Sequence, residues 1–137
     1  MASSIIEKQW TTKAGLDAVV AVMSFYDGYK HHRCGYVQVP VDHPWYGEDY
    51  YADSGDIDID VHGGLTFSGQ PVGIDHGWWF GFDCAHLGDG VIEPHSEYDL
   101  ALSGDGPAKS LEFCEAECES MAAQIVANGD CSNTGGA

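Results

Sequence analysis

Lysine and arginine are the scarcest chemical class in this sequence. Five of them stand against 22 aspartates and glutamates, so the formal net charge is -17, and Arg33 is the single arginine. So few cations cannot neutralise a phosphate backbone, and direct binding to DNA or RNA is therefore disfavoured. Three explanations of the acidity stay open: solubility, adaptation to a high-salt cytoplasm, and an acidic surface that mimics nucleic acid and meets a basic protein.

Long apolar segments and paired-cysteine motifs are also missing. No apolar run approaches the roughly 20 residues that a membrane span needs, and the first ten residues lack the charged and apolar regions of a secretory signal. We therefore expect a cytoplasmic protein without membrane contact. The five cysteines form no Cys-x-x-Cys motif. Cys114 and Cys118 are four apart on a predicted helix, too far apart for a disulfide, so reduced and buried thiols are expected.

The size of the chain fits one domain. At 137 residues it can bury a core, which we place at about residues 10–127, with a flexible tail over 128–137. Apolar residues at helical spacing predict an amphipathic helix over 108–127. Pro107 suits its first turn, and Asn128-Gly129 is a stop signal.

The predicted strands begin with a hairpin. Residues 16–24 and 34–39 are apolar runs of strand length, and Asp27-Gly28 between them is a turn signal. His31 and His32 are expected to be exposed in the connection. Local hairpins without helices between strands predict an α+β domain: an antiparallel sheet of about four to five strands, with the C-terminal helix packed on one face.

Residues 56–62 alternate like a strand with one buried face. Three β-branched residues alternate with three aspartates and His62, and Gly63-Gly64 directly afterwards would let backbone or ligand approach closely. The polar row is typical of a solvated strand face in an acidic protein. It also offers carboxylate and imidazole ligands for a divalent cation, with Asp60 and His62 as candidates.

Residues 78–84 are densely aromatic and predict a central strand covered on both faces. Asp83 stands at the end of this strand, where a carboxylate has to be hydrogen-bonded, paired or bound to a cation. It either caps the following turn through its own backbone or forms a site with His86. We interpret Cys84 as a structural thiol, because a Cys84/His86 nucleophile pair would have poor geometry.

Residues 40–54 show no regular pattern and are rich in tyrosine, aspartate and proline. Loops of this length in small domains are often functional. His43 and Trp45 are candidates for contacting a small ligand in a pocket walled by the tyrosines of the loop. The alternative is a loop fixed to the sheet by its aromatic side chains.

Five segments carry a resemblance to a known group of proteins. They read HRCGYVQVP, HPWYGEDY, VHGGLTF, WWFGFDCAHLGD and EAECESMAAQI. Together they resemble a family of small, uncharacterised proteins encoded by bacteriophages and by bacterial or archaeal genomes. The resemblance covers about residues 16–125 and implies a compact single domain of viral or mobile-element origin. Because the family has no established activity, it carries no catalytic residue over.

Two functions follow as hypotheses. The first is a small-ligand or divalent-metal site on the sheet, with catalysis left open because no motif names a reaction. Its ligand-binding candidates are His43, Trp45, His62, Gly63, Gly64, Asp83 and His86, and its metal candidates are Asp60, His62, Asp83 and His86. The second is a non-catalytic viral accessory or counter-defence protein in the host cytoplasm, which binds a host protein or sequesters a small molecule.

Overall fold

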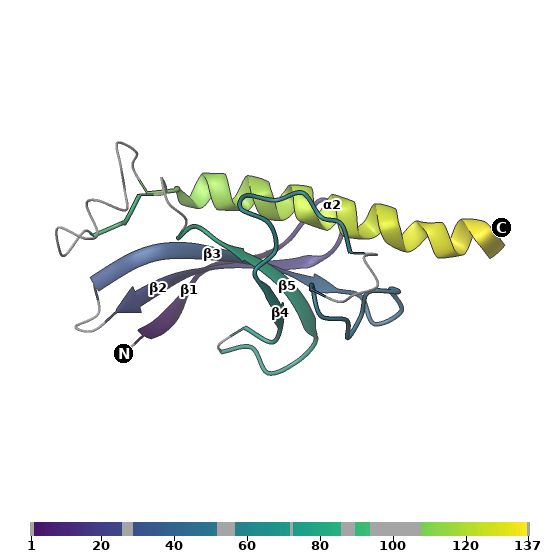
Figure 1. Cartoon of the computed structure of the whole chain (residues 1–137), viewed down its shortest axis with the longest axis horizontal. Helices are drawn as coiled ribbons and strands as arrows, with labels where there is room; N and C mark the ends of the chain where they lie inside the picture. Colours follow the sequence, from purple (N-terminus) through teal and green to yellow (C-terminus); the bar gives the residue numbers. More distant parts are fainter. Residues whose placement is uncertain are drawn as a thin grey trace.

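The computed structural model describes residues 2–25, 29–51, 57–71, 73–85, 90–93 and 108–136. They form one antiparallel sheet crossed by a single long helix (Figure 1). The strand order is β1-β2-β3-β5-β4. The elements are β1 (Ala2–Thr11), β2 (Asp17–Phe25), β3 (Tyr29–Val39), β4 (Phe67–Gly69), β5 (Trp78–Asp83) and α2 (Leu111–Gly136). The predicted α+β architecture, with the C-terminal helix on the sheet, is confirmed.

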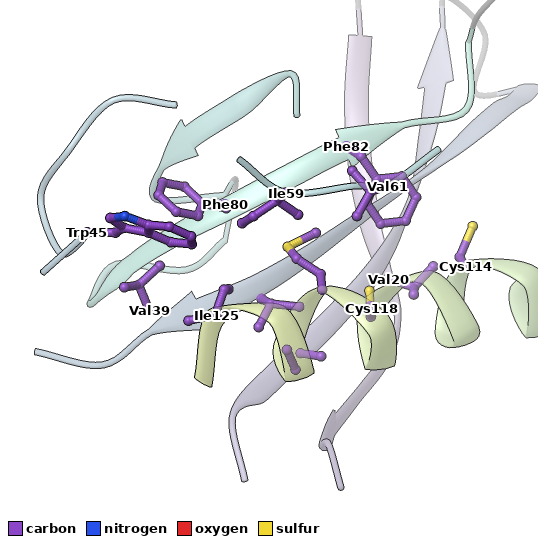
Figure 2. Close-up of a cluster of buried hydrophobic side chains, with 14 of the residues drawn as sticks. Val20, Val39, Trp45, Ile59, Val61, Phe80, Phe82, Cys114, Cys118 and Ile125 are labelled. Atoms are coloured by element: carbon purple, nitrogen blue, oxygen red, sulfur yellow. The ribbon is translucent and has the colours of Figure 1, made fainter. Parts of the chain in front are cut away.

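One face of the sheet, here called the helix face, packs against α2. Alternate residues of the central strands point to this face, and they meet the apolar stripe of the helix in a single buried cluster (Figure 2). Gly35 lies at the closest approach, because a Cβ atom there would stand 2.8 Å from Sγ of Cys118 and closer still to the ring of Phe82. The missing side chain at Gly35 therefore lets α2 pack closely against β3.

The opposite face, here called the far face, carries a smaller cluster. Val19, Ile74 and Trp79 are buried there, and Tyr36 packs against them. The ring of Tyr36 lies over Gly81 on the neighbouring strand, where a Cβ atom would stand 2.5 Å from its Cδ1 atom. The prediction that residues 78–84 form a strand with two apolar faces is confirmed, since Phe80 and Phe82 belong to the other cluster.

At the start of the chain, the structure has more strand than the sequence predicted. The hairpin of residues 16–24 and 34–39 is confirmed as β2 and β3, although β3 begins earlier, at Tyr29. The strand β1 was not predicted from sequence. It is fastened to α2 by side chains: Nζ of Lys8 lies 3.0 Å from a carboxylate oxygen of Glu115, and the Trp10 indole donates to Glu119 at 2.9 Å.

The prediction of a strand over residues 56–62 is wrong, since the described residues 57–62 pair with no strand. Residues 57–61 have no regular secondary structure and His62 begins a turn. Helix side chains satisfy three backbone groups of this segment in place of a neighbouring strand. The amide of Asp60 donates to Gln124 at 2.8 Å, Gln124 donates back to the Asp60 carbonyl at 2.9 Å, and the amide of His62 donates to Glu117 at 2.7 Å. The apolar alternation still has its predicted effect, since Ile59 and Val61 enter the helix-face cluster (Figure 2).

The predicted helix stop at Asn128-Gly129 is also wrong, because α2 continues to Gly136. Gly129 serves close packing instead: a Cβ atom there would stand 2.7 Å from Cδ2 of His43, so the imidazole lies against bare helix backbone. Within the described residues, no helix is long and apolar enough to cross a membrane.

Candidate functional site

The predicted metal candidates do not come together in the part of the chain that the structure describes. Asp60 is exposed and His62 half-buried on the helix face, where the His62 ring meets Phe113 edge-on at 5.2 Å between centroids. Asp83 projects from the far face, because its neighbours Phe82 and Cys84 point to the helix face. His86 lies outside the described residues. Among those described, no three histidine, cysteine or acidic side chains form a group that could hold a metal ion.

The glycines after His62 make a tight turn. Gly63 and Gly64 have φ angles of 70° and 81°, which favour glycine, and the amide of Gly64 donates to the carbonyl of Val61 at 2.9 Å. The pair reverses the chain after the segment that docks on α2. It therefore has an architectural role, and the ligand role predicted for both glycines stays a prediction.

Asp83 caps its own turn and adds to the effect of burial, which raises the pKa of two groups, the thiol of Cys34 and the hydroxyl of Tyr36. Its carboxylate accepts from the amide of Ala85 at 3.1 Å, as the capping alternative predicts. Across the strand it faces Cys34. Burial raises the pKa of the Cys34 thiol to about 12, and the Asp83 carboxylate adds to the increase. Burial likewise raises the pKa of Tyr36. A thiol protonated at neutral pH is a poor nucleophile, so this group of side chains does not form an activated cysteine site.

The other described cysteines are buried as well, and none of the four forms a disulfide with another described cysteine. Sγ of Cys84 lies 3.8 Å from Sγ of Cys114. The hydrogen bond between these two thiols lowers the pKa of Cys114, and the nearby Arg33 guanidinium lowers it further. Burial raises the pKa of Cys118. Reduced, buried thiols were the sequence prediction, and the four that the structure describes agree with it.

His43 and Trp45 belong to the core rather than to an open pocket. The His43 side chain has Nε2 2.6 Å from the carbonyl of Ile125 and Nδ1 accepting from the amide of Trp45 at 3.0 Å. This arrangement places the proton on Nε2 and fixes the neutral ring between loop and helix. The Trp45 ring is 5% exposed and packs on Phe80. The alternative prediction, a loop fixed by its aromatic side chains, describes this segment.

Further bonds hold the rest of residues 40–51 against the sheet. The Trp78 indole donates to the carbonyl of Glu48 at 2.9 Å, and the amide of Tyr50 donates to Ser68 at 3.2 Å. Tyr50 and Tyr51 stack edge to face with centroids 5.1 Å apart. Because the loop is bonded to α2, β4 and β5, its outward side chains are presented on a rigid support.

The outward side chains of this loop are acidic and aromatic. Val41 is 76% exposed, Tyr51 68% and Tyr46 38%. Asp42, Glu48 and Asp49 are exposed between them. We call these six side chains the loop surface: Val41, Asp42, Tyr46, Glu48, Asp49 and Tyr51. An open groove of about 300 Å³ adjoins it at Val41, lined by Gly15, Leu16, Asp17, Gln38, Val39 and Pro40.

The loop and the stretches of sequence on either side of it carry neither lysine nor arginine. The sequence has no lysine or arginine between Cys34 and Ala108, or after Lys109. Two cations have carboxylate partners at the β1 side of the molecule: Lys8 pairs with Glu115, and Arg33 makes two bonds to Glu7, at 2.7 and 3.1 Å. Asp58 and Asp60 are also exposed. The amide of Asp60 bonds to Gln124, and the ring of His43 in the loop bonds to the carbonyl of Ile125, so both segments meet neighbouring residues of α2.

Sequence reasoning missed a buried histidine pair. His31 and His32 were expected to be exposed, yet each is 8% exposed within β3. The missing information was a β-bulge in the hairpin, which the residue types alone do not indicate. Two consecutive histidines inside a β-branched and aromatic stretch were the available signal.

Comparisons with protein-family models, with curated proteins and with solved structures found no match to this chain.

Proposed function

We propose that this chain is a non-catalytic binding protein whose loop surface engages a basic region of a partner protein. The observation that carries the proposal is the composition of one rigid loop. Residues 40–51 expose two tyrosines and a valine among three carboxylates, with no lysine or arginine in the segment. The resemblance to phage-encoded proteins supports a host protein as that partner.

The exposed apolar groups favour a protein partner over a small ion. Tyrosine is enriched at protein interfaces, where it supplies contact area at low entropic cost. Val41 and Tyr51 are more than two-thirds exposed although neighbouring aromatic rings of the same loop are buried. The groove beside Val41, which includes Asp17, offers a place for a long basic side chain of the partner.

The charge of the loop surface gives the interaction its specificity and its speed. Asp42, Glu48 and Asp49 repel one another and attract a basic surface over about 8 Å, the Debye length at physiological salt. Complementary charge raises the association rate and excludes acidic partners such as nucleic acid. Binding should therefore weaken as salt concentration rises.

The alternative, a metal or small-ligand site at Asp60, His62, Asp83 and His86, has less support. Asp60 and His62 lie beside α2, whereas Asp83 leaves the opposite face of the sheet. A single ion does not bridge two faces of a sheet, because a metal–ligand bond is only about 2.0–2.6 Å long.

The proposal is tested by quantitative affinity capture from a bacterial host lysate with charge-matched variants. The loop variant combines Tyr51→Ala with Asp42→Asn and Asp49→Asn. The control combines Asp75→Asn and Glu112→Gln, which removes two exposed carboxylates elsewhere. We expect the loop variant to lose its partner by at least tenfold, since a central tyrosine contributes about 1–2 kcal/mol and each rim charge about 0.5 kcal/mol.

The control separates a specific surface from general acidity. It should retain the partner within about twofold, because exposed charges outside the interface contribute little. If both variants lost the same amount of bound partner, net charge alone would explain the binding, and the proposal would be contradicted. Failure of the wild-type protein to retain any partner in low salt would also contradict it.

A further inference from the structure

A β-bulge in the hairpin brings two consecutive histidines together. Met23 pairs with His32 and Ser24 pairs with Lys30, so His31 is an extra residue on β3. Consecutive side chains of a regular strand point to opposite faces, and a bulge re-aims one of them. The result is a hydrogen bond of 2.8 Å between Nδ1 of His31 and Nδ1 of His32. One of the two rings carries its proton on Nδ1 in this arrangement, and that proton must move to Nε2 before both Nδ1 atoms can bind an ion.

The two rings form a defined arrangement inside the protein. Their centroids are 5.0 Å apart, and their planes are nearly perpendicular, at 87°. Each residue is 8% exposed. The backbone around them is fixed, because the amide of Ile92 donates to the carbonyl of His31 at 2.8 Å and that of Glu93 to Lys30 at 2.9 Å. The backbone that carries both rings is therefore bonded to residues 92–93 on one side and to β2 on the other.

The spacing of the two nitrogen atoms matches neighbouring ligands of one ion. With bonds of 2.0–2.1 Å, two imidazole nitrogens stand about 2.9 Å apart at a right angle and about 3.4 Å apart at the tetrahedral angle. To admit an ion, the two nitrogen atoms would separate by about 0.1–0.6 Å, and the rings would turn so that both Nδ1 lone pairs face the ion. Neutral imidazole is the most common protein ligand for divalent transition metals.

The surroundings favour a cation. Asp83 projects from the same face of the sheet as His32, since Cys34, two residues further along β3, is its cross-strand partner. The carboxylate of Glu93 accepts from the amide of Lys30 at 2.6 Å, one residue before the pair. Arg33 points to the opposite face, where Glu7 neutralises it. The net charge of -17 raises the local concentration of cations further.

The geometry points to a metal site at which Nδ1 of His31 and Nδ1 of His32 bind one divalent transition-metal ion of the zinc class. The two rings supply two neighbouring coordination positions, and water or another donor completes the shell. The site uses none of the four metal candidates predicted from sequence. It lies at the start of β3, whereas the loop surface follows the end of that strand, so the two proposals are independent.

The test uses the full chain and Zn²⁺ alone. Isothermal titration and native mass spectrometry should give one Zn²⁺ per chain. Imidazole nitrogen NMR should show Nδ1 of two histidines shifting together, which identifies the ligand atoms without any substitution. His31→Gln and His32→Gln should each weaken binding at least tenfold, and His76→Gln, at an exposed histidine, should leave it unchanged.

The outcomes discriminate between a built site and other metal binding. Cys34→Ser should retain Zn²⁺, because the thiol is not among the proposed ligands. Folding of each variant is checked by circular dichroism; where a histidine variant fails to fold, the NMR shifts of the wild-type protein decide. Absence of stoichiometric Zn²⁺, shifts at other histidines only, or wild-type affinity in a folded His31→Gln or His32→Gln variant would overturn the proposal.

Discussion

Because His43 packs against Gly129, we expect Gly129→Ala to destabilise the protein when His43 is present and to stabilise it when His43 is replaced by alanine. In an exposed helix, Gly→Ala stabilises by about 1 kcal/mol. At Gly129 the new Cβ atom would stand 2.7 Å from Cδ2 and 3.1 Å from Nε2 of His43. The ring cannot retreat freely, because both of its nitrogen atoms are hydrogen-bonded.

The magnitude follows from these contacts. Overpacking of a core site costs about 1–3 kcal/mol, and a weakened hydrogen bond adds about 1 kcal/mol. After the gain in helix propensity, Gly129→Ala should lower the free energy of unfolding by about 2 kcal/mol, or roughly 8 °C in Tm. In a His43→Ala background the clash is absent, and the same substitution should stabilise by about 1 kcal/mol.

Urea denaturation followed by tryptophan fluorescence and circular dichroism measures all four variants of this cycle. Ala123→Gly, at an exposed position of the same helix, gives the propensity effect without a clash and should cost about 1 kcal/mol. A stabilising Gly129→Ala in the His43 background would refute the docking of the loop on the helix. A destabilising effect that persists without the ring would refute the clash as its cause.

Three further perturbations act on other contacts. Burial raises the pKa of Cys34 to about 12 and raises that of Cys118. The free energy of unfolding should therefore be constant below about pH 9 and fall above it by about 1.4 kcal/mol per pH unit for each thiol. In the Cys118→Ala variant, the urea midpoint should change less between about pH 9 and 11 than in the wild-type protein. Gln124→Ala removes both hydrogen bonds to Asp60 and should lower the free energy of unfolding by about 2 kcal/mol. A lower Tm and faster hydrogen exchange at the Asp60 amide would show this loss. A hydrogen bond from the β1 indole lowers the pKa of Glu119, so its stabilisation is present above about pH 4.5 and lost as pH falls; unfolding of a Glu119→Gln variant should depend less on acid pH.

Sequence periodicity predicted the central elements because burial and periodicity coincide there. The β2–β3 hairpin and the helix have apolar residues at the spacing of their own geometry, and one face of each enters the core. The segment 57–62 shows the limit of this reasoning. Its alternation reports one buried face, but the hydrogen-bond partner of an extended backbone is not encoded in that alternation, and here the partners are Gln124 and Glu117.

The candidate site could be predicted only in part, for two physical reasons. A single extra residue in a strand reverses the direction of a side chain, so the burial of His31 and His32 depends on a hairpin register that residue types do not fix. In the loop, aromatic composition predicted contact with the sheet. Which rings are buried, such as Trp45, and which are exposed, such as Tyr51, depends on tertiary contacts.

The most direct measurement for the proposed function is photo-crosslinking from the loop surface. p-Benzoylphenylalanine replaces Tyr51 in one protein and Asp75, an exposed control position, in another. After irradiation in a bacterial host lysate, position 51 should cross-link one basic protein, with a yield that falls as salt rises from 50 to about 500 mM. Cross-links that are equal from both positions, or a yield indifferent to salt, would contradict the assignment of residues 40–51 as the binding surface.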